Sequence, residues 1–302
     1  MYLWVEPVRL ILIFLLGWSG NAFAEKVFIE VKAGERVQDW CKRLAAQDIL
    51  TCGSVLHLAR TENYPVHSFV PGLRDLPTQS KNPFAGNRFE GLLPPGVFAF
   101  IDLDLKKPVL DAAGDYEERD LANARKVIKR LLAISAARLE HLPAGNGLRL
   151  REQMILASMV EKEAVSNVGH DKVAAVFYNR IARDDKLGSC PTVEYALGFH
   201  RPFLLYRDLE SVSSSPYNLY ARTGLPPTPI CFFSDAALAA VKKPPADNSI
   251  YFFVFDWTTG KLSFENISDY EKHRENAARA KENYRLKYGD IRQLFPGKFY
   301  EQ

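Results

Sequence analysis

Hydrophobic and polar positions alternate near the start of the chain and recur at helical spacing over much of the rest. Alternation over residues 27–31 predicts a strand, and the almost continuous apolar run 249–255 predicts a second, buried strand. Residues 262–264 would pair with that run across a turn at 258–260. Apolar residues three and four apart predict helices over residues 37–46, 117–141, from near 150 through 163, 171–183 and 270–284.

Helix-breaking residues divide these elements into two groups. Residues 64–96 are rich in Pro, Gly, Asn and Ser, which disfavour regular structure. We place a domain boundary there, with a small α/β module and its linker in residues 25–80 and a mixed domain in residues 81–302. From Gly188 to the predicted hairpin the chain is expected to be mostly loop, of the kind that carries binding groups on a rigid scaffold. The fold class is therefore α+β.

Residues 1–24 have the pattern of a secretory signal peptide. Arg9 precedes an apolar run over residues 10–16, and Ala22-Phe23-Ala24 provides a cleavage site. The run is shorter than the ~20 residues that span a membrane. We expect cleavage after Ala24 and export to the periplasm or cell envelope. The alternative is a short anchor in the inner membrane.

Composition narrows the function classes. The chain has 302 residues, of which 47% are apolar and 25% charged, as in ordinary globular proteins. The net charge of +3 comes without a basic stripe interleaved with aromatic residues, so nucleic-acid binding has no support. Export would favour pairing of the four cysteines, with three possible connectivities. No C-x-x-C pair exists and the histidine spacing offers no zinc site, so no metal site is predicted.

Two carboxylates on one predicted helix are the candidate acid–base groups. Glu163 continues the apolar stripe of Leu156 and Val160, whereas Glu161 lies ~200° away around the helix. A carboxyl held against apolar surface has a raised pKa, which suits it to protonate a leaving oxygen near neutral pH. The alternative is that both are solvated helix charges, with Lys162 between them.

A series of motifs follows the carboxylates in a fixed order. This series resembles the YceG-like family of endolytic murein transglycosylases, most clearly over residues 148–230 and more loosely from Phe89-Glu90-Gly91 to about His273. The motifs are Val160-Glu161-Lys162-Glu163, Phe177-Tyr178-Asn179-Arg180, Ser189-Cys190-Pro191-Thr192, Ser215-Pro216-Tyr217-Asn218-Leu219-Tyr220 and Gly224-Leu225-Pro226-Pro227-Thr228-Pro229-Ile230.

The resemblance implies a reaction and a substrate. It implies an enzyme that cleaves the β-1,4 bond between N-acetylmuramic acid and N-acetylglucosamine in peptidoglycan strands. The products carry 1,6-anhydromuramic ends, nascent strands stop growing, and no cofactor is needed. Peptidoglycan synthases at the inner membrane are the candidate partners. The N-terminal module resembles the LysM-like module of this family, and a generic α+β cap is the alternative.

The resemblance also assigns residues. Glu163 takes the catalytic position, and Glu161 is the reserve candidate. Glu163 should lie on the floor of an open groove, with walls from the loops at 191–192, 217–218 and 225–226. The expected substrate-binding residues are Glu161, Asn179, Pro191, Thr192, Tyr217, Asn218, Tyr220, Leu225 and Pro226. In the absence of the resemblance, the 217–220 segment could equally serve only to pin a loop.

The chain departs from the family pattern at several positions. Gly188 and Cys190 replace a Gln and an Asp, Thr228 replaces a Gly, and Leu262 replaces a His. Since Cys190 takes an acidic position and Cys231 follows the Pro-Pro turn, we predict a disulfide between them. Cys41 and Cys52 would form the other disulfide.

The lost acidic residue leaves a second class of function open. The chain could be a non-catalytic protein that binds glycans or regulates cell-wall synthesis. A lyase using pyridoxal phosphate ranks last, because no Lys lies in a recognisable phosphate-binding context.

Overall fold

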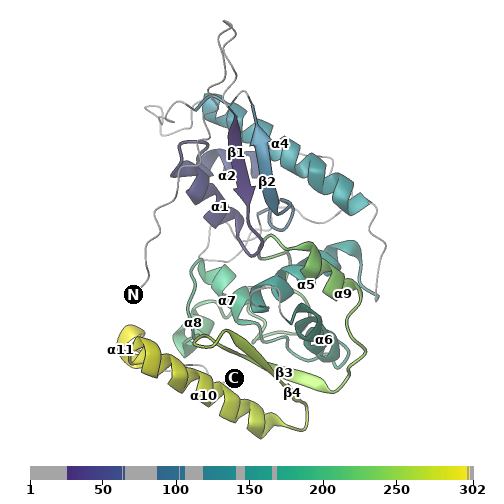
Figure 1. Ribbon diagram of the computed structural model, residues 1–302, viewed down its shortest axis with the longest axis vertical. Coiled ribbons are helices and arrows are strands. Elements are labelled where there is room, and N and C mark those ends of the chain that lie inside the picture. The colour runs from purple at the N-terminus through teal and green to yellow at the C-terminus, as the bar shows by residue number, and fades with distance from the viewer. Residues whose placement is uncertain are drawn as a thin grey trace, which may run out of the picture.

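The molecule consists of two bodies stacked along its long axis (Figure 1). The computed structural model describes residues 26–62, 64, 87–101, 103–105, 118–140, 147–164, 169–297 and 299. The predicted signal peptide and most of the proline-rich stretch lie outside the described residues. The predicted α+β fold class is confirmed, because helices and strands occur in both bodies.

The upper body is built on a two-stranded antiparallel sheet. Val27 lies opposite Phe100 and Val31 opposite Gly96. Ile29 and Val31 point inward and are buried, as the alternating pattern predicted. Two helices follow the first strand, and the second of them packs against the long helix α4. The elements are β1 (Val27–Val31), α1 (Val37–Ala45), α2 (Cys52–Thr61), β2 (Gly96–Phe100) and α4 (Glu118–Glu140).

Two of these elements were not predicted. The α2 helix begins after Thr51, whose side-chain oxygen accepts a hydrogen bond from the Ser54 amide at 3.2 Å. The β2 strand follows the proline-rich stretch, after the predicted boundary at residue 80, and pairs with β1, which precedes that boundary. The upper body therefore crosses the predicted domain boundary and continues through α4.

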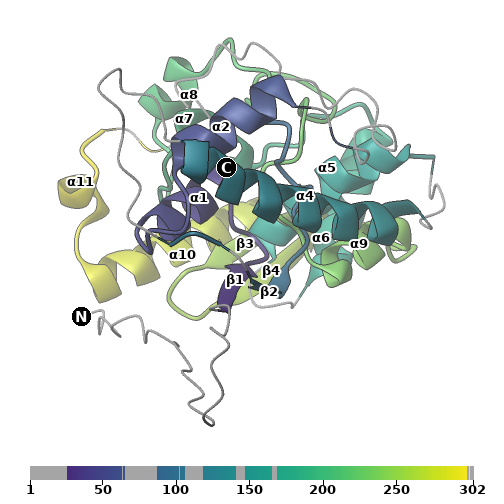
Figure 2. The ribbon, with the colours of Figure 1, turned by 90° about the horizontal axis from the view of Figure 1, so that it is seen from above.

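The lower body surrounds α5, which is buried along most of its length. Helices α6 and α9 pack against α5 on one side of the lower body, and α7 and α8 lie on its other side (Figures 1 and 2). The predicted hairpin is confirmed, with Phe253 opposite Phe264, and it packs between α6 and α10. The elements are α5 (Leu150–Glu163), α6 (His170–Ile181), α7 (Cys190–Leu197), α8 (Tyr206–Ser211), α9 (Asp235–Lys242), β3 (Ile250–Asp256), β4 (Lys261–Asn266), α10 (Tyr270–Tyr288) and α11 (Ile291–Leu294).

Residues 188–249 lie mostly outside helices and strands, as predicted, but three short helices that were not predicted, α7, α8 and α9, lie in that stretch. Their ends carry ordinary helix signals. Pro191 occupies the first turn of α7, Gly198 ends it at φ +83°, and the Ser234 side chain caps α9. Each helix has at most eight residues. Such helices are too short to show a repeating apolar face in the sequence.

Backbone hydrogen bonds join the two bodies directly. The Gly34 amide donates to the Phe232 carbonyl at 2.7 Å, and the Phe232 amide donates to the Glu35 carbonyl at 2.9 Å. Beside them, the buried Glu90 carboxyl accepts from the Val37 amide and from the Tyr195 hydroxyl, both at 3.1 Å. Burial raises the pKa of Glu90 to about 8, against the opposing effect of these two donors.

One of the two predicted disulfides is present. Cys41 and Cys52 are bonded, with their Cα atoms 5.0 Å apart. The predicted disulfide between Cys190 and Cys231 is wrong, because both remain thiols. The Cys231 thiol lies beside the Ser158 carbonyl at 3.2 Å, whereas the Cys190 thiol contacts the Tyr220 hydroxyl at 2.9 Å.

Within the described ranges, the helices are either too short or too polar to cross a bilayer.

Candidate active site

A groove of about 570 Å³ opens in the lower body, beside the C-terminal end of α5. Its walls come from the turn before α7, from α7 itself, from residues 200–204, from β3 and from α10. Charged and aromatic side chains are both present in the walls. Within the part of the chain that the structure describes, no cluster of three or more His, Cys, Asp or Glu could hold a metal ion.

Glu163, the last residue of α5, lies half-buried in the wall of this groove. Its Oε1 accepts a hydrogen bond of 2.7 Å from the Ser189 hydroxyl. Burial raises the pKa of Glu163 to about 7. The Ser189 bond and the positive charges of Arg180 and Lys162 oppose that rise, whereas the nearby Glu194 carboxylate adds to it. The site therefore holds a carboxyl that keeps its proton close to neutral pH.

Arg180 fixes the turn that carries Ser189. Its Nη1 donates to the Leu187 carbonyl at 2.7 Å, while Nε and Nη2 donate to the Tyr251 carbonyl at 3.1 and 3.0 Å. Gly188, next in the turn, has φ +55°, and a Cβ there would lie 3.3 Å from Arg180 Nη1. A glycine meets both demands, since it tolerates positive φ and leaves room for the guanidinium.

The groove brings together a subset of the predicted site residues. Glu163, Cys190, Pro191 and Tyr220 all line it. Cys190 and Tyr220 contact each other, and burial raises the pKa of the Cys190 thiol, so this position presents a neutral group beside Glu163.

Three predicted substrate-binding residues instead bond to the protein itself. Glu161 Oε2 accepts from the Ser234 amide at 2.9 Å and from its hydroxyl at 2.6 Å, which ties α5 to the start of α9. The Asn179 amide donates to the carbonyls of residues 247 and 250 at 2.9 and 2.8 Å, and thereby joins α6 to β3. The Thr192 hydroxyl donates to the Ser189 carbonyl at 2.8 Å inside the first turn of α7.

The other two predicted walls do not line the groove. Tyr217 and Asn218 are buried, with the Tyr217 hydroxyl 2.7 Å from Thr228 Oγ1 and the Asn218 amide donating to the Leu209 carbonyl at 3.1 Å. They pin the loop, which was the alternative left open by the sequence. Leu225 and Pro226 line a separate cavity of about 320 Å³. The expectation that these two loops wall the groove was therefore wrong.

Several groove residues were missed by sequence reasoning. Glu194, His200 and Trp257 line the groove, but they come from a segment expected to be loop and from the hairpin turn. The available signals were weak: a lone tryptophan beside a turn, and a carboxylate three residues after Pro191.

Comparisons with known proteins identify relatives of this chain. The model of the YceG-like family matches residues 15–279. An endolytic murein transglycosylase of Bacillus subtilis is 34% identical over 131 residues, which are 43% of this chain and 35% of that protein. Another, from Streptococcus pneumoniae, is 30% identical over 210 residues, which are 68% of this chain and 34% of that protein. The chain thus spans about a third of the length of both relatives.

The fold has a solved counterpart. A crystal structure of a YceG-like protein from Listeria monocytogenes superposes with a TM-score of 0.62 at 26% identity, and covers 81% of this chain and 75% of that one. Since the family model matches most of the chain, this chain belongs to the YceG-like family.

Proposed function

We propose that the chain is a lytic transglycosylase that cleaves the glycan strands of peptidoglycan. The observation that carries the proposal is Glu163, a carboxyl with a pKa of about 7 that is hydrogen-bonded to Ser189 in the wall of the groove. A general acid works best when its pKa lies near the working pH, so this carboxyl suits the protonation of a glycosidic oxygen. The names of the relatives supply the substrate class.

One carboxyl is sufficient for this reaction. Glu163 would give its proton to the O4 of the leaving N-acetylglucosamine as the bond from muramic C1 to O4 breaks. The muramic C6 hydroxyl oxygen then bonds to C1, and its proton passes to the Glu163 carboxylate. The acid is thereby regenerated and the strand is left with a 1,6-anhydro end.

An ordinary glycosidase needs a second carboxylate as nucleophile or base. Glu194 is the carboxylate whose charge raises the pKa of Glu163, and it is the candidate for that second group. Its Oε1 accepts from the Arg201 amide at 3.1 Å, and its Oε2 lies 3.0 Å from His200 Nδ1. These partners occupy both oxygens, which favours the single-carboxyl reaction.

The wider setting is part of the proposal. Anhydro ends would terminate nascent strands in the cell envelope, after export through residues 1–24, and synthases at the inner membrane would be the partners. The N-terminal part, predicted as a module and its linker in residues 25–80, would act as a LysM-like module that contacts the glycan. The strand, turn and short helix at residues 27–45 support that identity.

A second candidate function is glycan binding without turnover. The observation that favours it is Cys190, a neutral thiol in the groove at the position where the family pattern has an Asp. If that Asp is required to bind or orient the sugar, the groove would bind strands and leave them intact.

A comparison of two glutamine variants tests the catalytic assignment. Glu163→Gln keeps the size of the side chain but cannot deliver a proton. The yield of anhydromuropeptides from purified sacculi, measured by mass spectrometry, should therefore fall by a factor on the order of 10²–10⁴. Glu161→Gln is the matched control on the same helix, and it should retain most activity, because its carboxylate bonds to Ser234 away from the groove.

Two outcomes would change the conclusion. If Glu163→Gln digests sacculi at the wild-type rate while Glu161→Gln loses activity, Glu161 and not Glu163 is the general acid. Binding of sacculi by the wild type, with no anhydro ends released, would establish the second candidate function.

A further inference from the structure

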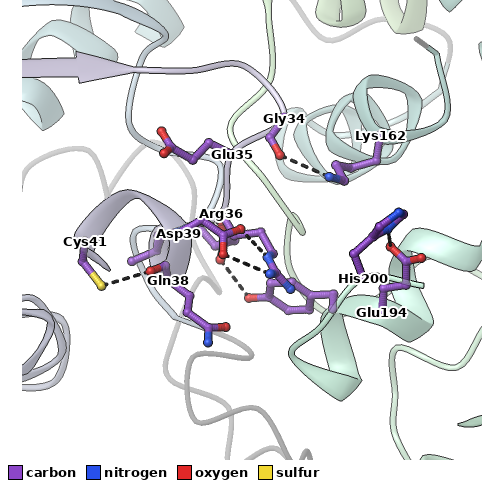
Figure 3. Close-up of polar contacts among 12 residues, drawn as sticks. Gly34, Glu35, Arg36, Gln38, Asp39, Cys41, Lys162, Glu194 and His200 are labelled. Atoms are coloured by element: carbon purple, nitrogen blue, oxygen red, sulfur yellow. Dashed lines mark hydrogen bonds and ion pairs between the residues drawn. The ribbon is translucent and has the colours of Figure 1, made fainter. Parts of the chain in front are cut away.

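A series of interacting residues leads from Glu163 along the groove wall to an exposed tryptophan. The charge of the Glu194 carboxylate raises the pKa of Glu163. Glu194 Oε2 lies 3.0 Å from His200 Nδ1, and the His200 ring packs on Trp257 with ring centres 5.2 Å apart. All four residues line the same groove. Figure 3 shows Glu194 and His200 pointing toward each other, near Lys162. The mechanism proposed above uses neither His200 nor Trp257.

The contact with Glu194 determines which ring nitrogen of His200 carries a proton. A carboxylate can only accept, so the 3.0 Å contact places a proton on His200 Nδ1. In the neutral ring Nε2 is then an acceptor. The His200 side chain is 54% exposed, whereas Glu194 is 10% exposed. The buried carboxylate thus holds an imidazole whose free nitrogen can accept from a hydroxyl or an amide N–H.

Trp257 is 38% exposed and lies in a turn that hydrogen bonds stabilise. It sits in the hairpin turn, where Asp256 Oδ1 accepts from the Thr258 amide at 2.8 Å and Oδ2 accepts from the Asn283 amide of α10 at 2.8 Å. The Phe255 ring supports the indole edge-on, with ring centres 4.9 Å apart and planes at 84°. The scaffold therefore holds a large apolar ring at the solvent side of the groove.

A pyranose ring is the ligand that matches this pair of groups. Its C–H face is apolar and slightly positive, and packs on the negative face of an aromatic ring. Its hydroxyl or N-acetyl N–H would meet His200 Nε2.

We propose that Trp257 and His200 form a saccharide subsite, which binds a sugar unit of the strand beyond the one at Glu163. Glu194 acts as the positioning residue for His200. The proposal rests on the function proposed above, because it assumes that the groove holds a glycan strand. It adds a dependence on strand length, since a fragment too short to reach Trp257 gains nothing from the subsite.

Binding to a protein that cannot turn over isolates the subsite. In the full chain with Glu163→Gln, we would titrate β-1,4-linked N-acetylglucosamine dimer and hexamer while following tryptophan fluorescence and the Trp257 indole N–H resonance. The hexamer should shift that resonance. Adding Trp257→Ala should weaken hexamer binding about 5–10-fold and leave dimer binding unchanged, whereas Trp257→Phe should keep most of the affinity.

A matched control separates the subsite from general loss of apolar surface. Tyr288→Ala removes an aromatic ring that is 41% exposed at the end of α10 and lies outside the groove lining, and it should leave hexamer binding unchanged. The indole resonance needs no variant at position 257, so it reads out the proposal even if Trp257→Ala does not fold.

The two proposals fail in different ways. An unmoved Trp257 resonance with hexamer bound, or equal hexamer affinity in Trp257→Ala, would overturn the subsite while anhydro ends from wild type still support the enzyme. Hexamer binding that depends on Trp257, in a protein whose wild type releases no anhydro ends, would support the subsite and remove the catalytic proposal.

Discussion

At the scale of single residues, opposing influences set the working pH of Glu163. Burial raises its pKa to about 7, and the Ser189 hydroxyl, which bonds best to the ionised form, lowers it. The acid form is present below this pKa and lost above it. We therefore expect release of anhydro ends from sacculi to decline above about pH 7, approaching tenfold per pH unit, in a pH–rate profile.

Removal of the Ser189 hydroxyl should move that decline to higher pH. Ser189→Ala takes away a donor to the carboxylate, so the pKa of Glu163 should rise, by about one unit for a single bond to a charged group. Thr192→Ala is the control, because its hydroxyl bonds to the Ser189 carbonyl and not to Glu163. A decline at the same pH in wild type and Ser189→Ala would show that another group limits the rate.

The burial of Glu163 is the site feature that the sequence pattern indicated. Glu163 continues an apolar stripe, and its burial follows from that register on the helix. Tyr217 and Asn218 carried no comparable signal. Their rings and amides suit a sugar or a buried hydrogen bond equally, and only the packing against Thr228 and α8 decides between the two. Side-chain type alone cannot separate a binding group from a loop pin.

At the scale of elements, the disulfide joins α1 to the first residue of α2. Closing a loop over a sequence separation of 11 should stabilise the fold by ~3 kcal/mol through loss of unfolded-state entropy. We expect reducing agent to lower the free energy of unfolding of wild type by about that amount in urea titrations. The double variant Cys41→Ala/Cys52→Ala should start lower and show no response to reductant. Cys190→Ser, which leaves the bond in place, should respond like wild type, and a response in the double variant would contradict the assignment.

Length decided which elements were predictable. The long helices, with 23 residues in α4 and 19 in α10, repeat their apolar faces over several turns and were predicted within a few residues at each end. The short helix α7 contributes groove residues without a readable period. The β2 strand depends on β1 as its partner, and a non-local pairing leaves no local pattern.

At the scale of the whole molecule, Glu90 bonds to both bodies. It accepts from Val37 in the upper body and from Tyr195 in the lower one, and it is fully buried. With a pKa of about 8 it is mostly neutral at pH 7, so Glu90→Gln should be tolerated. Glu90→Ala leaves both donors unpaired and should cost about 2–4 kcal/mol of unfolding free energy in a denaturant titration. Equal stability of the two variants would mean that the contact between the bodies does not depend on this carboxyl.

The pairing of β1 with β2 also orders events in time. A ribosome makes Val27–Val31 about 70 residues before the Gly96–Phe100 strand that completes its hydrogen bonds, and long loop closures are slow. Helices form and short loops close in microseconds or less, so α1 and α2 can pack together early. During that interval β1 presents an open edge, which invites pairing with other chains. The first strand made is thus among the last to be secured, and a chaperone that shields residues 27–31 would protect the newborn chain at its most exposed point.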